Sequence, residues 1–121
     1  MKQKILVVDD DQPILQLLEL LLKILGYEPV LSENGNEALQ LVKMDPPALI
    51  LLDINMTPIT GWEFLKRLRA EPKYKEIPVI VFTVLTSIEE GLAQIQDPRL
   101  GVLNKPVTLS ELKTGIDRFL S

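Results

Sequence analysis

The sequence predicts an α/β fold in which one parallel β-sheet is covered by helices on both faces. Two observations lead to this prediction. Short uninterrupted apolar runs are typical of strands buried on both faces, and the chain has three, Ile5-Leu6-Val7-Val8, Ala48-Leu49-Ile50-Leu51-Leu52 and Val79-Ile80-Val81-Phe82. Segments with helical periodicity separate these runs. The resulting βαβαβαβαβα alternation indicates a single doubly wound (βα)5 domain.

The first half of the chain contains two strands and two helices in this scheme. The strand at residues 5–8 is followed by apolar residues at helical spacing, and Gly26 is placed at the C-cap of that helix. We expect a second strand over residues 28–32 and a second helix over residues 36–43. These elements bring the chain to the apolar run at residues 48–52.

The second half continues the alternation. A third helix is expected over residues 62–70, entered through Gly61 and ended before Pro72. The S/T-x-x-E capping box marks two further helix starts, Ser87-Ile88-Glu89-Glu90 and Thr108-Leu109-Ser110-Glu111. The short apolar segment Gly101-Val102-Leu103 between them is the expected fifth strand. Residues 1–121 therefore form one domain, with no repeat, linker or low-complexity segment.

Composition excludes several classes of function. The 121 residues include no cysteine and no histidine, which excludes disulfides, thiolate or zinc sites and histidine-based acid-base catalysis. The net charge is -4 and no run of Lys or Arg is present, so we expect no direct binding of nucleic acid. Because only four apolar residues follow the first four residues, we expect no signal peptide or membrane span and a cytoplasmic location.

Polar residues follow the predicted strands where a ligand site is expected. In open parallel sheets the ligand crevice lies beyond the carboxyl ends of the strands. If the first and third strands are neighbours, Asp9, Asp10 and Asp53 converge there. Their mutual repulsion is relieved by protonation or by a hard cation, and oxygen-only ligands suit Mg²⁺. Asn55 can add its backbone carbonyl, whereas we assign Asp11 to the N-cap of the following helix.

Two further residues end the fourth and fifth strands. Thr83 offers a hydroxyl and Lys105 a cation, the groups that hold a phosphoryl group opposite a carboxylate and Mg²⁺. Taken singly, each of these residues also has a structural explanation, as a turn residue, a β-branched strand residue or a loop residue. Their joint placement at strand ends predicts an acyl-phosphate site.

The chain resembles the response-regulator receiver domains over essentially its whole length. The motifs that carry the resemblance are Ile5-Leu6-Val7-Val8-Asp9-Asp10, Leu51-Leu52-Asp53-Ile54-Asn55-Met56 with Gly61 eight residues after the aspartate, Val79-Ile80-Val81-Phe82-Thr83, and Lys105-Pro106. The resemblance implies the family's flavodoxin-like strand order, 2-1-3-4-5. It also implies two-component signalling, with a sensor histidine kinase or a histidine phosphotransfer domain as the donor.

The resemblance assigns roles to the site residues. Asp53 is the implied phosphoacceptor, Asp9, Asp10, Asp53 and the Asn55 carbonyl surround Mg²⁺, Thr83 is the switch hydroxyl and Lys105 binds the phosphate. A cis Lys105-Pro106 bond is implied as well. Such a domain is not a turnover enzyme but a switch that assists its own phosphorylation and dephosphorylation. A downstream protein or output domain would bind the fourth helix, fifth strand and fifth helix, without contact to nucleic acid or membrane.

The sequence also departs from the family pattern. Thr57 replaces the usual proline, with Pro58 next, and Val84 is bulkier than the small residue expected after Thr83. Pro98-Arg99 replaces Gly-Ala before the fifth strand, and Val102 replaces an aromatic, which affects the output face.

Two alternative functions agree with parts of the sequence. Asp53-Ile54-Asn55-Met56-Thr57 resembles the DxDxT motif of haloacid-dehalogenase-like phosphatases, but Asn55 lacks the acid-base carboxylate. A pseudo-receiver that binds partners without phosphorylation is the other, and the complete acidic set argues against it.

Overall fold

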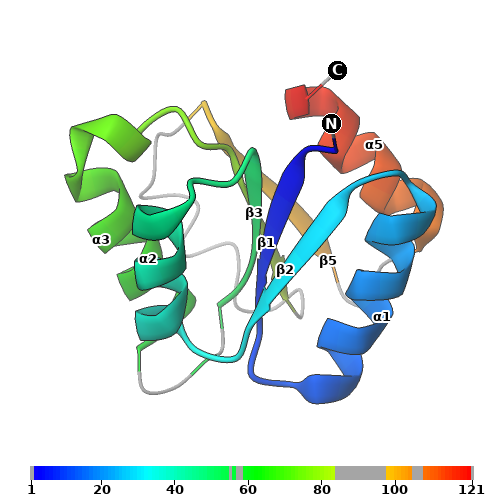
Figure 1. Cartoon of the computed structure of the whole chain (residues 1–121), viewed down its shortest axis with the longest axis horizontal. Coiled ribbons are helices and arrows are strands. Elements are labelled where there is room, and N and C mark those ends of the chain that lie inside the picture. Colours follow the sequence, from blue (N-terminus) through cyan, green and yellow to red (C-terminus); the bar gives the residue numbers. More distant parts are fainter. Residues whose placement is uncertain (1, 55, 57–58, 84–97, 105–107, 121) are drawn as a thin grey trace.

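A five-stranded parallel sheet forms the centre of the molecule. The computed structural model describes residues 2–54, 56, 59–83, 98–104 and 108–120. The strands are β1 (Lys4–Val8), β2 (Glu28–Ser32), β3 (Leu49–Asp53), β4 (Val79–Thr83) and β5 (Leu100–Asn104). Their order is β2-β1-β3-β4-β5, and every neighbouring pair is parallel (Figure 1). The predicted doubly wound fold and its 2-1-3-4-5 order are confirmed.

Helices cover both faces of this sheet. Helices α1 (Gln12–Ile24) and α5 (Leu109–Leu120) lie on one side, and α2 (Gly35–Met44) and α3 (Gly61–Ala70) lie on the other (Figure 1). A short 3-10 helix, η1 (Pro72–Tyr74), follows α3 and was not predicted. The helix expected to begin at Ser87 lies outside the described residues.

Two hydrophobic clusters fill the space between the sheet and its helices. Successive side chains of a strand point to opposite faces, so Leu6 and Val8 of β1 pack toward α2 and α3, whereas Ile5 and Val7 pack toward α1 and α5. All four are at most 2% exposed. The uninterrupted apolar runs in the sequence therefore reflect strands with two buried faces.

Helix α1 ends in a turn that contains a glycine. Leu25 is the C-cap of α1, and Gly26 is the next residue, with a φ of 90°. The amide of Gly26 donates to the Lys23 carbonyl and that of Tyr27 donates to the Leu22 carbonyl, at 3.1 and 2.9 Å. This left-handed turn favours glycine. Gly26 therefore follows the C-cap instead of occupying it, and α1 ends one position earlier than predicted.

Two N-caps in the described part of the chain use a hydroxyl. The predicted capping box at α5 is confirmed, because the Thr108 hydroxyl accepts from the Glu111 amide and the Glu111 carboxylate accepts from the Thr108 amide, at 3.1 and 3.2 Å. At α3 the Thr60 hydroxyl accepts from the Glu63 amide at 3.1 Å. The start of α3 was predicted to within one residue. Its capping signal was not recognised, although Thr60-Gly61-Trp62-Glu63 matches the same S/T-x-x-E pattern.

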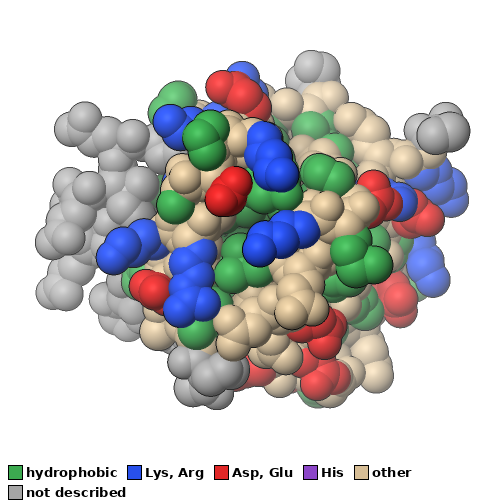
Figure 2. Space-filling model, turned by 60° about the vertical axis from the view of Figure 1, so that its left-hand side comes forward, with side chains coloured by type: hydrophobic (Ala, Val, Ile, Leu, Met, Phe, Trp, Pro, Cys, Tyr) green, Lys and Arg blue, Asp and Glu red, His purple; other side chains and the backbone are tan. Residues whose placement is uncertain are grey.

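The outer surface of α2 and α3 carries several basic side chains. Figure 2 shows Lys and Arg side chains gathered over these helices, and Lys43, Arg67 and Arg69 lie in their last turns. Cations at the carboxyl ends of helices interact favourably with the helix dipole. Arg69 also donates to the carbonyls of Tyr74 and Ile77, at 3.0 and 2.7 Å, and so fixes η1 against α3.

The two edges of the sheet are β2 and β5. In β2, Pro29 lies in register with Ile5, and the preceding Glu28 amide donates to the Gln3 carbonyl at 2.9 Å. Along a strand the amides alternate in direction, so the Pro29 nitrogen is on the free edge. In β5, Val102 is half-buried and packs with the cluster below α2 and α3.

Candidate functional site

Two aspartates lie side by side at the carboxyl ends of the central strands. Val8 is in register with Leu52, so Asp9 directly follows β1 beside Asp53, the last residue of β3. Asp9 is fully buried and Asp53 is 3% exposed. Adjacent parallel strands thus bring together two carboxylates that are 44 positions apart in the chain, as predicted.

A third carboxylate completes an acidic cluster. Oxygens of Asp9, Asp10 and Asp53 all lie within 4.8 Å of one another. Asp10 is exposed, so the cluster is open to solvent on one side while its floor is buried. We call these three residues the acidic cluster.

Backbone contacts fix the position of Asp9. Its amide donates to the Ser32 carbonyl of β2 at 3.1 Å, and its carboxylate accepts from the Asp11 amide at 3.0 Å. Asp11 occupies the N-cap position of α1, but its side chain makes no capping hydrogen bond. The predicted N-cap position of Asp11 is thus confirmed, although the side-chain hydrogen bond that usually accompanies this position is absent.

The loop after Asp53 is held by a close backbone approach. The Gly61 amide donates to the Ile54 carbonyl at 2.8 Å. A Cβ atom on Gly61 would lie 2.4 Å from the Asp53 carbonyl oxygen and 2.6 Å from the Ile54 Cα, closer than side-chain atoms approach. Only glycine therefore lets the start of α3 pack directly on the backbone of the predicted phosphoacceptor.

The remaining predicted site residues belong to the neighbouring strands and loops. Thr83 is the last residue of β4, where Phe82 is in register with Asp53 and Thr83 with Asn104. The Thr83 side chain lies outside the described part of the structure. The same holds for the following residues, on which the other expectations about the site depend: Asn55, Thr57, Pro58, Val84, Lys105 and Pro106.

The acidic cluster has the donor set of a site for a hard cation. All its ligand atoms are carboxylate oxygens, and two of the three side chains are buried. Like charges at this separation destabilise one another unless a cation or proton compensates them. The exposed position of Asp10 leaves room for water ligands, which Mg²⁺ usually keeps. The residues present therefore fit such an ion.

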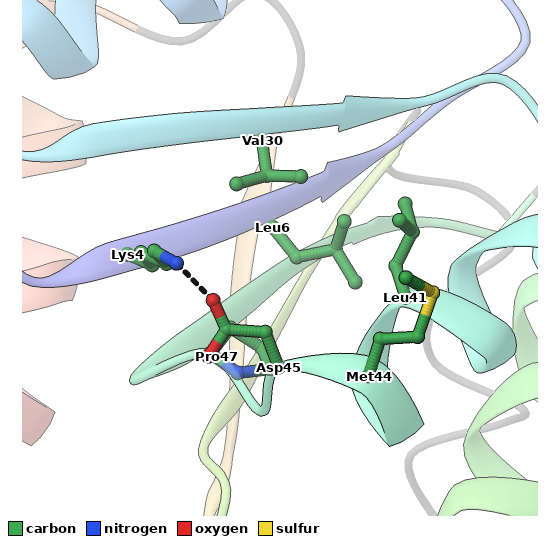
Figure 3. A pocket seen from close by; sticks show the side chains of 7 residues that line it. All are labelled: Lys4, Leu6, Val30, Leu41, Met44, Asp45 and Pro47. Atoms are coloured by element: carbon green, nitrogen blue, oxygen red, sulfur yellow. Dashed lines mark hydrogen bonds and ion pairs between the residues drawn. The ribbon is translucent and has the colours of Figure 1, made fainter.

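A separate pocket lies at the opposite end of the sheet. It has a volume of about 230 Å³ and lies between the start of β1 and the end of α2 (Figure 3). Its lining is mainly apolar, with the Lys4–Asp45 ion pair at one side (Figure 3). Since the acidic cluster is at the carboxyl ends of the strands, this pocket is not part of the candidate site.

Comparison with known proteins gives the class of this fold and site. The family model described as the response regulator receiver domain matches residues 5–117. The chain therefore belongs to the response regulator receiver domain family, whose members act in two-component signalling.

Curated relatives agree with this assignment. The chain is 35% identical over 112 residues to response regulator MprA of Mycolicibacterium vanbaalenii, which covers 93% of the chain and 48% of the relative. It is 34% identical over 115 residues to probable transcriptional regulator ycf27 of Porphyra purpurea, which covers 95% of the chain and 46% of the relative. The chain thus spans about half the length of these relatives.

Solved structures of similar length share the fold. The chemotaxis protein CheY4 of Vibrio cholerae superposes with a TM-score of 0.89 at 32% identity, covering 98% of this chain and 99% of that one. A putative response regulator from Chloroflexus aurantiacus superposes with a TM-score of 0.90 at 30% identity, covering 99% of this chain and 98% of that one. Among the described residues, no helix combines the length and apolar character needed to cross a bilayer.

Proposed function

We propose that this chain is a phosphorylation switch in which Asp53 accepts a phosphoryl group. The observation that carries the proposal is the position of Asp53, which is 3% exposed at the end of β3 with the oxygens of Asp9 and Asp10 within 4.8 Å. A buried carboxylate beside two others is suited to phosphoryl transfer only when cationic charge is supplied. Residues 1–121 act together as one domain in this proposal.

The donor is a sensor histidine kinase or a histidine phosphotransfer domain. An Asp53 carboxylate oxygen attacks phosphorus, and the bond from phosphorus to the imidazole nitrogen breaks as the new O–P bond forms. The electron pair of the broken bond stays on that nitrogen. The imidazole then takes up a proton from solvent and is neutral. The protein contributes mainly position and electrostatics to such a transfer.

The residues around Asp53 have distinct roles. Asp9, Asp10, Asp53 and the Asn55 backbone carbonyl hold Mg²⁺, which when bound neutralises the carboxylates and the phosphoryl oxygens. The Thr83 hydroxyl and the Lys105 ammonium bind the phosphoryl oxygens. Backbone contact with Gly61 keeps Asp53 in place. The domain turns over no separate substrate and assists only its own phosphorylation and loss of the phosphoryl group.

The signal leaves the domain through a protein contact. Phosphorylation changes the affinity of a downstream protein or output domain for the surface formed by the fourth helix, β5 and α5. The switch works in the cytoplasm, where its donors present phosphohistidine, and it contacts neither nucleic acid nor membrane directly.

The test is phosphorylation by acetyl phosphate, followed by mass spectrometry and peptide mapping. With Mg²⁺ the chain should gain one phosphoryl group on Asp53. The Asp53→Asn variant should stay unlabelled, and so should wild-type protein to which a chelator of Mg²⁺ is added. Asp45→Asn removes an exposed carboxylate far from the cluster and should be labelled normally. Labelling of another residue, or labelling of Asp53 without metal, would refute the assignment.

A further inference from the structure

Helix α1 exposes apolar side chains on the face that points away from the sheet. Leu17, Leu20 and Ile24 are 44%, 57% and 59% exposed. Their spacing of three and four residues places them on one face of the helix. We call these three residues the α1 stripe. On the opposite face, Leu15, Leu18 and Leu22 are buried in the core, so α1 is apolar on two faces.

The core does not require the outer apolar face. A surface helix normally buries one apolar face and presents polar residues on the other. Here polar residues are confined to one flank of the α1 stripe, where Gln16, Glu19 and Lys23 follow one another at helical spacing. The other flank continues into Leu21, which is half-buried against the core. A contiguous exposed apolar surface of this kind marks an interaction site.

We propose that the α1 stripe is the interface of a symmetric dimer, in which α1 packs antiparallel against α1 of a second copy of this chain. A two-fold axis near Leu20 places Leu17 of each copy beside Ile24 of the other, and the two Leu20 side chains near each other. The stripe is therefore complementary to itself, as an isologous interface requires. This surface is separate from the acidic cluster, so the proposal does not depend on phosphorylation.

Charge selects the antiparallel arrangement. The two-fold axis of an antiparallel pair brings the polar flanks of the two helices together. At a rise of about 1.5 Å per residue, Glu19 of one copy then lies at nearly the same height as Lys23 of the other. A parallel pair would instead place each polar flank over the apolar flank with Leu21 of the other copy, where the charges would lose water without gaining partners.

The expected affinity is low. One pair of helices buries less than the roughly 1,200–2,000 Å² of a stable interface, so we expect a Kd on the order of 0.1 mM. The first experiment is sedimentation equilibrium over protein concentrations that span this value. Wild-type protein should shift from monomer to dimer with concentration.

Two matched substitutions test whether the stripe is responsible. Leu20→Gln removes an apolar side chain from both halves of the interface and should raise the Kd about tenfold or more, since each copy contributes the change. Met44→Gln removes an apolar side chain that is 81% exposed on α2 and should leave the Kd unchanged. Circular dichroism of both variants checks that they remain folded. Equal effects of the two substitutions would overturn the proposal.

Charge reversal tests the antiparallel register. Glu19→Lys and Lys23→Glu should each weaken dimerisation, because like charges then meet across the two-fold axis. A mixture of the two variants should associate more strongly than either alone, since opposite charges are restored between copies. A mixture that associates no better, or wild-type protein that stays monomeric at all concentrations because the stripe binds a different protein, would refute the proposal.

Discussion

Gly61→Ala is the substitution that most directly tests how the candidate site is built. Gly61 begins α3, and its missing side chain lets the helix contact the backbone of β3. An added Cβ would lie 2.4 Å from the Asp53 carbonyl oxygen and 2.6 Å from the Ile54 Cα. Neither atom is the end of a flexible side chain, so the backbone must move.

The magnitude follows from this contact. Overpacking usually costs about 1–3 kcal/mol, and we take the middle of this range for a clash with backbone. We therefore expect the free energy of unfolding to fall by about 2 kcal/mol. Because a domain of this size has an unfolding entropy of about 0.25 kcal/mol/K, the Tm should fall by about 8 °C. The movement also displaces Asp53, so labelling by acetyl phosphate should slow.

Gly115→Ala provides a matched control. Its Cβ would lie 3.3 Å from the Leu103 Cδ1, the end of a side chain that can move, in the interior of α5. Alanine favours a helix interior over glycine by up to about 1 kcal/mol, so this variant should be as stable as wild type or more stable. Urea unfolding and the initial labelling rate measure both effects. A Gly61→Ala variant within about 0.5 kcal/mol of wild type, with an unchanged labelling rate, would refute the reasoning.

Three further predictions concern separate parts of the fold. Thr108→Ala removes the hydroxyl that accepts from the Glu111 amide and should cost about 1 kcal/mol in urea unfolding; no loss would contradict the cap. Burial and then the charge of Asp117 raise the pKa of Tyr27. The Tyr27 hydroxyl therefore loses its proton at lower pH in the unfolded chain than in the folded one, so the stability of the fold decreases as the pH rises above about 10. Tyr27→Phe should make this decrease smaller, which thermal melts at alkaline pH measure. Asp10→Asn relieves repulsion in the acidic cluster, so it should raise the Tm measured without Mg²⁺. It should also reduce the increase in Tm that Mg²⁺ produces, because one ligand of the ion is lost. The opposite changes would argue against a cation site.

Much of the fold could be predicted because the burial of a strand determines which residue types occur along it. The runs that contain Val7, Leu51 and Val81 are apolar at every position since both faces of the sheet are covered, and β2 was predicted with the bounds that the structure has. The convergence of Asp9 with Asp53 followed once β1 and β3 were taken as neighbours. The strand order itself came from the family resemblance.

Other features depend on contacts that no local pattern reports. Asp11 has the residue type and position of an N-cap, but its side chain makes no capping hydrogen bond. The 3-10 helix η1 owes its position to Arg69, which donates to carbonyls five and eight residues further on. Gly61 was noted for its spacing from Asp53 and as the entry to the third helix, but not for its packing, because the reason for glycine there is the approach of another backbone segment. Thr60, by contrast, was a readable signal that was overlooked.

Pro29 has a consequence for the behaviour of the protein in a crowded solution. A sheet edge with free amides is a template on which a strand from another molecule can add, and repeated addition leads to fibres. The Pro29 nitrogen is on the free edge of β2, so the ladder to β1 loses no hydrogen bond while an incoming strand finds one donor fewer. The residue therefore protects this edge of the folded protein against polymerisation at little cost to the folding of the sheet.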